Sequence, residues 1–145
     1  MGASLFPAAP GQPLIQPWRG AAGDLVDLAI GQGPLWWLRG SRMRTRQGLM
    51  DEWAAAAQFP PHFGGTWDAL RDALADLPEG GTFLVLEADQ VLCEAPPDDG
   101  LTWLAVLRTV AGELAPRTFR LILQAEPAQY DTLVRGLKAL EKALG

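Results

Sequence analysis

The chain has 145 residues with a formal net charge of −5, and 48% of its residues are apolar. This composition excludes a disordered chain and permits a single domain with its own hydrophobic core. One cysteine, Cys93, excludes an intrachain disulfide and agrees with a reducing compartment. Because the sequence shows no signal-peptide pattern and no segment long and apolar enough to span a membrane, we predict a cytoplasmic protein.

The first part of the chain predicts an extension, a strand and a helix. Residues 1–34 are rich in proline, glycine and alanine, and we expect them to pack loosely or to wrap the body. LWWLR at 35–39 is a short and mostly apolar run, which is typical of a buried strand. A helix is expected over 48–57, and the prolines that follow Phe59 end it.

The second part of the chain alternates helices and strands. Thr66 is the expected N-cap of a helix over 67–77. The apolar residues of this helix recur at helical spacing and are expected to face the core: Trp67, Leu70, Leu74 and Leu77. The other expected elements are, in order, a strand, a helix, a strand and an amphipathic helix, over 82–88, 101–115, 118–124 and 125–145.

Short apolar strands separated by helices predict an α/β fold, a three-stranded parallel sheet covered by helices. We expect residues 35–124 to form this domain, with 1–34 as an N-terminal extension. Residues 125–145 are expected to be an extra C-terminal helix that packs on the same domain. Four tryptophans lie in the expected strands and helices and should belong to the core: Trp36, Trp37, Trp53 and Trp103.

The charge is unevenly distributed along the chain. Residues 59–99 carry nine acidic residues and one basic residue, Arg71, a net charge of −8, whereas the rest of the chain carries +3. An acidic segment disfavours nucleic acid as a partner and favours a basic protein. An ordinary solvated surface would give the same pattern, so charge alone leaves both interpretations open.

The residues that carry most catalytic chemistry are sparse. The single histidine, His62, and the single cysteine, Cys93, lie far apart without metal-ligand spacing, so we predict no metal site. The sequence contains no nucleophile elbow, dinucleotide fingerprint or P-loop, so we predict no cofactor and no catalytic residue. An enzyme that used Asp68, Asp72 and His62 in a closed, carboxylate-rich pocket remains an alternative.

Asp68 and Asp72 lie four residues apart on the helix expected over 67–77. Asp68 falls in the first turn, where the helix dipole favours a negative charge, and Arg71 could pair with it at i,i+3. Asp72 lies one turn further along and faces a like charge, and we expect Arg71, its neighbour in sequence, to point elsewhere. Asp72 is therefore either part of a solvated face or available to a cation on another molecule.

The stretch FPPHFGGTWDALRDALADL, from Phe59 to Leu77, resembles the signature of the barstar family, the inhibitors of barnase-type ribonucleases. That signature combines a proline, an aromatic pair, a glycine and an asparagine with a helix that starts hydrophobic–Asp–Ala–Leu–x–Asp. The order of expected elements from Leu35 to Gln124 is also similar to that of the family.

The resemblance implies a mechanism in which this loop and helix plug a nuclease active site, with Asp72 in the place of a substrate phosphate. The contact residues that it implies are His62, Phe63, Gly64, Thr66, Asp68, Arg71 and Asp72. The family prototype has tyrosine, asparagine and an aromatic residue where this chain has His62, Thr66 and Arg71. A further acid on its later long helix corresponds to Thr109 here.

The primary hypothesis is therefore a cytoplasmic ribonuclease inhibitor or immunity protein that binds a small basic ribonuclease without doing chemistry. The alternative is a barstar-like interaction module with a non-nuclease partner. Neither hypothesis requires nucleic acid, a membrane or a cofactor, and the oligomeric state is left open.

Overall fold

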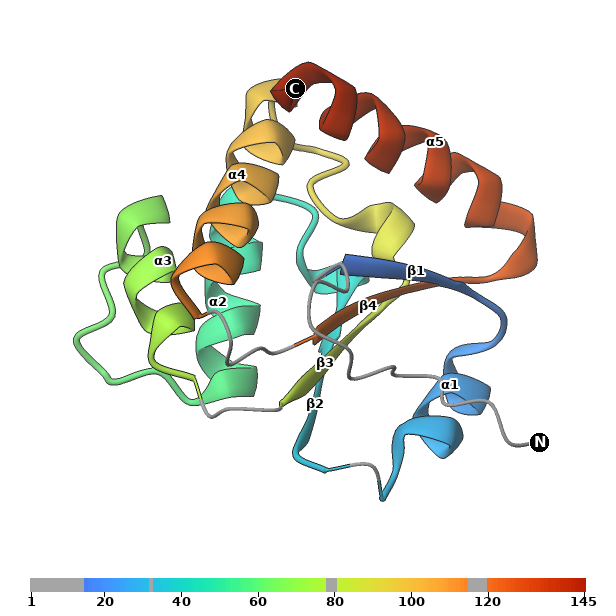
Figure 1. Ribbon diagram of the computed structural model, residues 1–145, viewed down its shortest axis with the longest axis horizontal. Coiled ribbons are helices and arrows are strands. Elements are labelled where there is room, and N and C mark those ends of the chain that lie inside the picture. Colours follow the sequence, from blue (N-terminus) through green and yellow to red (C-terminus); the bar gives the residue numbers. More distant parts are fainter. Residues whose placement is uncertain (1–14, 32, 78–80, 115–119) are drawn as a thin grey trace.

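The computed structural model describes residues 15–31, 33–77, 81–114 and 120–145 (Figure 1). Its strands form one parallel sheet in the order β1-β4-β3-β2. The strands are β1 Ile15–Arg19, β2 Leu35–Arg39, β3 Thr82–Leu86 and β4 Arg120–Ala125. The helices are α1 Ala22–Ala29, α2 Arg46–Ala57, α3 Trp67–Ala75, α4 Pro97–Leu114 and α5 Pro127–Leu144. Two 3-10 turns, η1 Gly40–Arg42 and η2 Ala88–Gln90, follow β2 and β3.

The α/β class and the parallel sheet are confirmed, but the prediction of three strands is wrong, because the described residues form a sheet of four. The additional strand, β1, comes from the segment that the sequence predicts as a loose extension, and it pairs with β4 from Ile15↔Leu121 to Arg19↔Ala125. Pro17 lies inside β1 and masks the strand pattern. An edge strand tolerates proline because one side of it makes no ladder hydrogen bonds.

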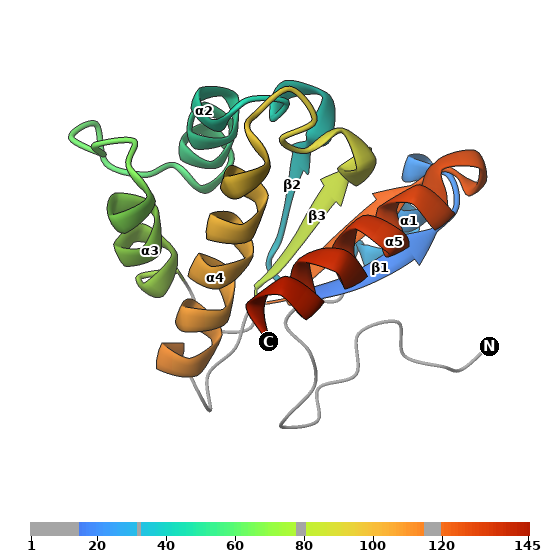
Figure 2. The same ribbon diagram turned by 90° about the horizontal axis from the view of Figure 1, so that it is seen from above.

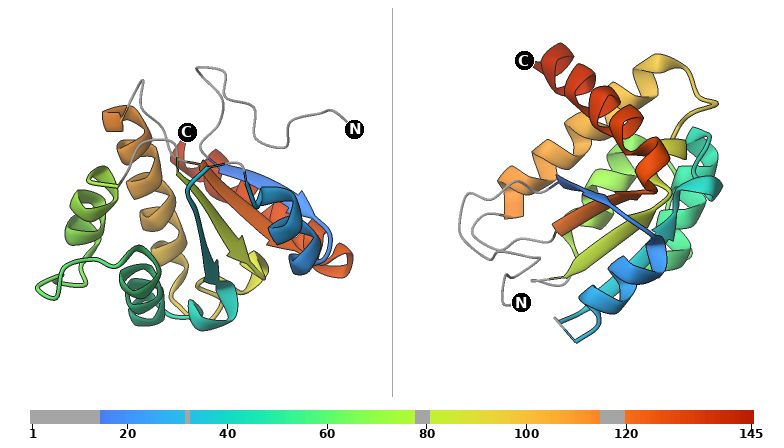
Figure 3. Two further views of the ribbon diagram at one scale, coloured as in Figure 1. Left: turned by 90° about the horizontal axis from the view of Figure 1, so that it is seen from below. Right: turned by 90° about the vertical axis from the view of Figure 1, so that its right-hand side faces the viewer.

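Both faces of the sheet are covered by helices, as the apolar strands predict (Figure 3). Phe83, Val85, Leu121 and Leu123 alternate with Leu84 and Ile122 along the central strands. The first set joins the main core with residues of α2, α3, α4 and α5. The second set packs against Leu25 and Ala29 of α1.

The expected tryptophan core is only partly correct. Trp53 and Trp103 are buried, and Trp36 is half-buried with its ring stacked on Phe83 at a centroid distance of 4.8 Å. Trp37 is 46% exposed. It lies on the edge strand β2 and on the face covered by α1, which packs on the central strands, so its ring is left largely in solvent.

A buried glutamine joins the carboxyl ends of three strands. The Gln124 side chain on β4 donates from Nε2 to the carbonyl of Gly20 at 2.7 Å, after β1. Its Oε1 accepts from the backbone N–H of Glu87 at 2.8 Å, after β3. Gln124 is fully buried, so these two bonds fix the relative positions of the strand ends.

The helix boundaries differ from the predictions by a few residues. α3 ends at Ala75 rather than at 77, and α4 begins at Pro97 rather than at 101. Proline is favourable at the start of a helix, where its missing N–H costs nothing. Among the described residues, no helix is long and apolar enough to cross a membrane.

Candidate functional site

The loop between α2 and α3 has a defined conformation. α2 ends at Ala57, and its C-cap residue Gln58 adopts the left-handed region with φ 54°. The N–H of Phe59 donates back to the Ala54 carbonyl at 3.0 Å. The N–H of Phe63 then donates to the Pro60 carbonyl at 2.9 Å. The ring centroids of Phe59 and Phe63 lie 5.0 Å apart, and both rings pack against the core. These contacts anchor the loop, while His62 between them stays exposed.

The start of α3 is fixed by a glycine and a cap. Gly65 has φ +68°, a conformation that glycine adopts at no steric cost. Thr66 follows it, and its hydroxyl accepts a hydrogen bond from the N–H of Ala69 at 3.1 Å. Thr66 is therefore the N-cap that the sequence predicts. Together, the turn and the cap determine where the first turn of α3 points.

α3 buries one face and exposes the other. Leu70 and Leu74 are fully buried, and the helix packs against α4 at the side of the molecule away from α5 (Figure 2). Asp68 and Asp72, four residues apart, share the exposed face, and the side chain of Asp72 is 72% exposed. The helix dipole stabilises the negative charge of Asp68 in the first turn.

The expectation that Arg71 points away from Asp72 is wrong. Nη2 of Arg71 lies 3.1 Å from Oδ1 of Asp72, and the two form an exposed ion pair. Adjacent residues do not face each other on a helix, but a long arginine side chain can fold back to the next carboxylate. The hydrogen bond and the charge of Asp72 raise the pKa of Arg71, and the charges of Glu113 and Asp68 raise it further.

Glu113 on α4 is a residue that sequence reasoning missed. Thr109, where the resemblance implies that the family has a further acid, donates its hydroxyl to the Ala105 carbonyl at 3.0 Å. Glu113 lies one turn further along α4, and its charge acts on Arg71 across the contact between the two helices. The spacing of one turn from Thr109 is the signal that could have indicated it.

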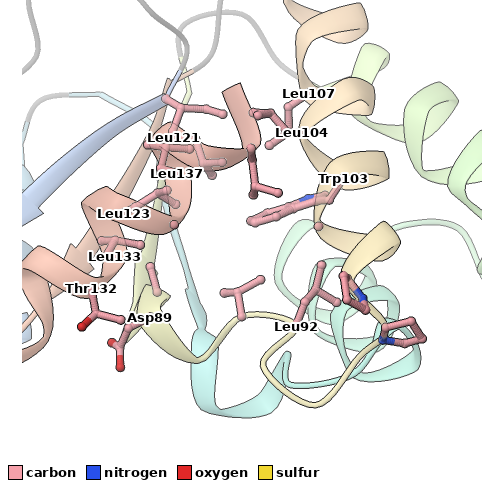
Figure 4. A pocket seen from close by; sticks show the side chains of 18 residues that line it. Asp89, Leu92, Trp103, Leu104, Leu107, Leu121, Leu123, Thr132, Leu133 and Leu137 are labelled. Carbon is pink, nitrogen blue, oxygen red and sulfur yellow. The ribbon is translucent and has the colours of Figure 1, made fainter. Parts of the chain in front are cut away.

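The seven predicted contact residues come from one continuous stretch, and each is exposed or half-buried: His62, Phe63, Gly64, Thr66, Asp68, Arg71 and Asp72. A cavity lies between α4 and α5 (Figure 4), and none of these seven residues lines it. The carboxylates of Asp68 and Asp72 therefore lie outside this cavity. Within the described ranges, no group of three or more His, Cys, Asp or Glu side chains could hold a metal ion. The geometry is that of an exposed surface that presents charged side chains on a hydrogen-bonded backbone.

A comparison with known families decides the assignment. A family model described as Barstar (barnase inhibitor) matches residues 35–126, which include the whole loop and α3. The chain belongs to the barstar family. A search of the curated proteins found no match. Barstar-family membership supports a protein-binding role of the barnase-inhibitor kind.

Proposed function

We propose that this barstar-family protein inhibits a small basic ribonuclease by covering its active site with residues 60–76. The observation that carries the proposal is the carboxylate of Asp72, which is exposed on a helix whose start is fixed by the Thr66 cap. An exposed carboxylate on a fixed helix can occupy the place of a substrate phosphate. As an immunity protein, the chain would protect the cell that makes the nuclease.

Preorganisation supports this proposal. The Phe59–Phe63 ring pair, the Phe63–Pro60 hydrogen bond and the Thr66 cap hold the loop in one conformation before any partner arrives. A surface that is already ordered loses less conformational entropy when it binds. Binding would then require little rearrangement of the backbone of α3.

The charges of the site also support a basic partner. The charges of Asp68, Asp72 and Glu113 all act on Arg71, and these four groups together carry a net negative charge. Complementary charge speeds the encounter with a cleft lined by lysine, arginine or histidine, and it disfavours acidic partners. Glu113 offsets part of the positive charge that Arg71 adds to the surface.

The ion pair of Arg71 with Asp72 makes a non-nuclease partner the second candidate. Asp72 would have to exchange Arg71 for a cation of the nuclease, a step that an unpaired carboxylate would not need. A partner that offers a carboxylate to Arg71 and a cation to Asp72 could bind both side chains without breaking their ion pair. The inhibition assay distinguishes these two candidates.

The test is cleavage of a fluorescent RNA by a panel of small basic ribonucleases in the presence of increasing amounts of the protein. The proposal predicts that the rate for at least one nuclease falls linearly to near zero at one equivalent. An unrelated acidic nuclease serves as the control for sequestration of the RNA. No inhibition across the panel, or equal inhibition of the control nuclease, would contradict the proposal.

A further inference from the structure

The outer side of strand β2 carries unpaired backbone groups. β2 forms the edge of the sheet opposite β1 (Figure 3), and no strand of the described residues pairs with its outer side. The Thr82 N–H donates to the Pro34 carbonyl at 3.0 Å, so the even-numbered residues of β2 bond to β3. Because backbone groups alternate along a strand, the N–H and C=O groups of Leu35 and Trp37 point outward. An unpaired strand edge is a template for another extended chain.

The backbone of Arg39 confirms this direction and limits the open part of the edge. Its N–H donates to Oε2 of Glu52 on α2 at 2.8 Å and not to β3. Glu52 thus closes the carboxyl end of the edge, and charged side chains commonly protect edge strands in this way. The open part of the edge therefore extends from Leu35 to Trp37.

Exposed apolar side chains lie on the face of the sheet that α1 covers. Leu35 packs on this face, whereas Trp36 and Leu38 pack in the main core, so the side chain of Trp37 shares the face of Leu35. The exposed large hydrophobic residues of the described chain all lie on this side: Leu28 and Ile30 at the end of α1, and Trp37 on β2. An apolar side chain on an added strand would remove the ring of Trp37 from water.

The charges at the carboxyl end of β2 favour an acidic occupant. Arg39 shares a face with Trp37, because side chains two residues apart point to the same side of a strand. Arg42 follows in η1, and neither guanidinium has an ion-pair partner in the part of the chain that the structure describes. Together these two cations exceed the charge of Glu52. A carboxylate next to the residue that covers Trp37 would therefore be attracted to Arg39.

We propose that the open edge of β2 binds an extended acidic segment of a second protein, which adds to the sheet as an antiparallel strand. The unpaired N–H and C=O groups of Leu35 and Trp37 require an extended backbone, and antiparallel pairing is the more stable kind. An apolar residue of the segment would lie opposite Trp37 and exchange both backbone hydrogen bonds with it. An acidic residue two positions earlier in the segment would face Arg39.

This edge is separate from the proposed nuclease-binding surface. Leu70 and Leu74 of α3 pack in the main core, on the face of the sheet opposite to α1 and Trp37. The chain would then hold a nuclease and a second protein at the same time. The test of the edge needs no nuclease, so the two proposals can fail independently.

The test uses an acetylated and amidated heptapeptide, Ser-Glu-Thr-Val-Thr-Val-Ser, whose first valine would lie opposite Trp37. Binding to the full chain is followed by NMR, through shifts and slower hydrogen exchange of the Leu35 and Trp37 amides. N-methylation of the first valine removes the N–H that would donate to the Trp37 carbonyl. N-methylation of the following threonine removes an N–H that would point away from β2. We expect the first change to weaken binding about tenfold or more and the second to leave it nearly unchanged.

An exchange of charges tests the role of Arg39. A second peptide carries lysine in place of glutamate, and the unaltered chain should bind the glutamate peptide about fivefold more tightly. Arg39→Glu should reverse this preference. Arg19→Glu is the matched control, because Arg19 is the exposed last residue of the other edge strand, β1, and its variant changes the net charge equally. It should retain the preference for glutamate, and circular dichroism checks that both variants fold.

The proposal would be overturned by any of the following results. No binding of the unmethylated glutamate peptide up to its solubility limit would leave the edge without this kind of occupant. Equal affinities of the two N-methylated peptides would show that the backbone of β2 takes no part. An unchanged preference in Arg39→Glu would remove Arg39 from recognition. A dimer of the unaltered chain in sedimentation, with the amides of Leu35 and Trp37 already protected, would assign the edge to a second copy.

Discussion

The guanidinium of Arg71 lies 3.1 Å from the carboxylate of Asp72, so the proposed site contains its own counterion. A partner cation must compete with Arg71 for Asp72. We therefore predict that Arg71→Ala tightens binding to a basic nuclease, by about threefold or more at low salt. Stopped-flow association kinetics and titration of inhibition measure the effect.

Arg135→Ala is the control for this prediction. Arg135 lies on α5, away from α3, and its replacement changes the net charge by the same amount. It should leave affinity nearly unchanged. Weaker binding by Arg71→Ala would show instead that Arg71 itself contacts the partner.

The position of α3 depends on its N-cap. Thr66→Ala removes the oxygen that accepts from the Ala69 N–H, and we predict a loss of about 1 kcal/mol in the free energy of unfolding. Thr66→Ser keeps the oxygen and should retain most of the stability. Urea unfolding of both variants measures the difference, and an equal loss in both would assign the effect to the threonine methyl group.

The relative positions of the strand ends depend on the buried side chain of Gln124. Gln124→Leu would leave the Gly20 carbonyl and the Glu87 N–H without their partners. We predict a loss of roughly 2–4 kcal/mol in the free energy of unfolding, because each unsatisfied buried group costs ~1–3 kcal/mol. Gln129→Leu, at an exposed position on α5, is the matched control and should be nearly neutral. A loss for Gln124→Leu as small as that of the control would contradict the role of Gln124.

Local sequence patterns predicted the elements whose signal is local. β2 has the predicted bounds of 35–39, and Thr66 caps α3 as predicted. Both features depend on a few neighbouring residues, an apolar run for the strand and a hydroxyl just before the helix for the cap. β1 was missed because Pro17 resembles a strand breaker until the strand is known to lie at an edge.

The partners of charged side chains were harder to predict than the helices and strands. Contacts between helices place Glu113 near Arg71, although 42 positions separate them in the chain. Spacing rules allowed Arg71 to pair with Asp68 and predicted that it points away from Asp72, but the flexible side chain pairs with Asp72. The role of each predicted contact residue and the domain limits at 34 and 124 remain predictions, since they depend on a partner or on the behaviour of separate fragments.

At the scale of the whole molecule, the acidic segment 59–99, with its net charge of −8, should steer a basic partner toward the site. We predict that the association rate with a target nuclease falls about tenfold between low and physiological ionic strength, as salt screens this attraction. The dissociation rate should change much less. An association rate independent of salt would contradict electrostatic steering.

The central claim is that Asp72 on α3 binds a basic nuclease active site, and the most direct measurement compares inhibition by the unaltered chain, Asp72→Asn and Asp131→Asn. Asp131 lies exposed on α5, so its variant loses the same charge away from the site. The account predicts that Asp72→Asn weakens inhibition by about 30-fold or more, as expected of a hot spot, with an unchanged unfolding midpoint. Asp131→Asn should inhibit like the unaltered chain. Equal inhibition by all three proteins would contradict the claim.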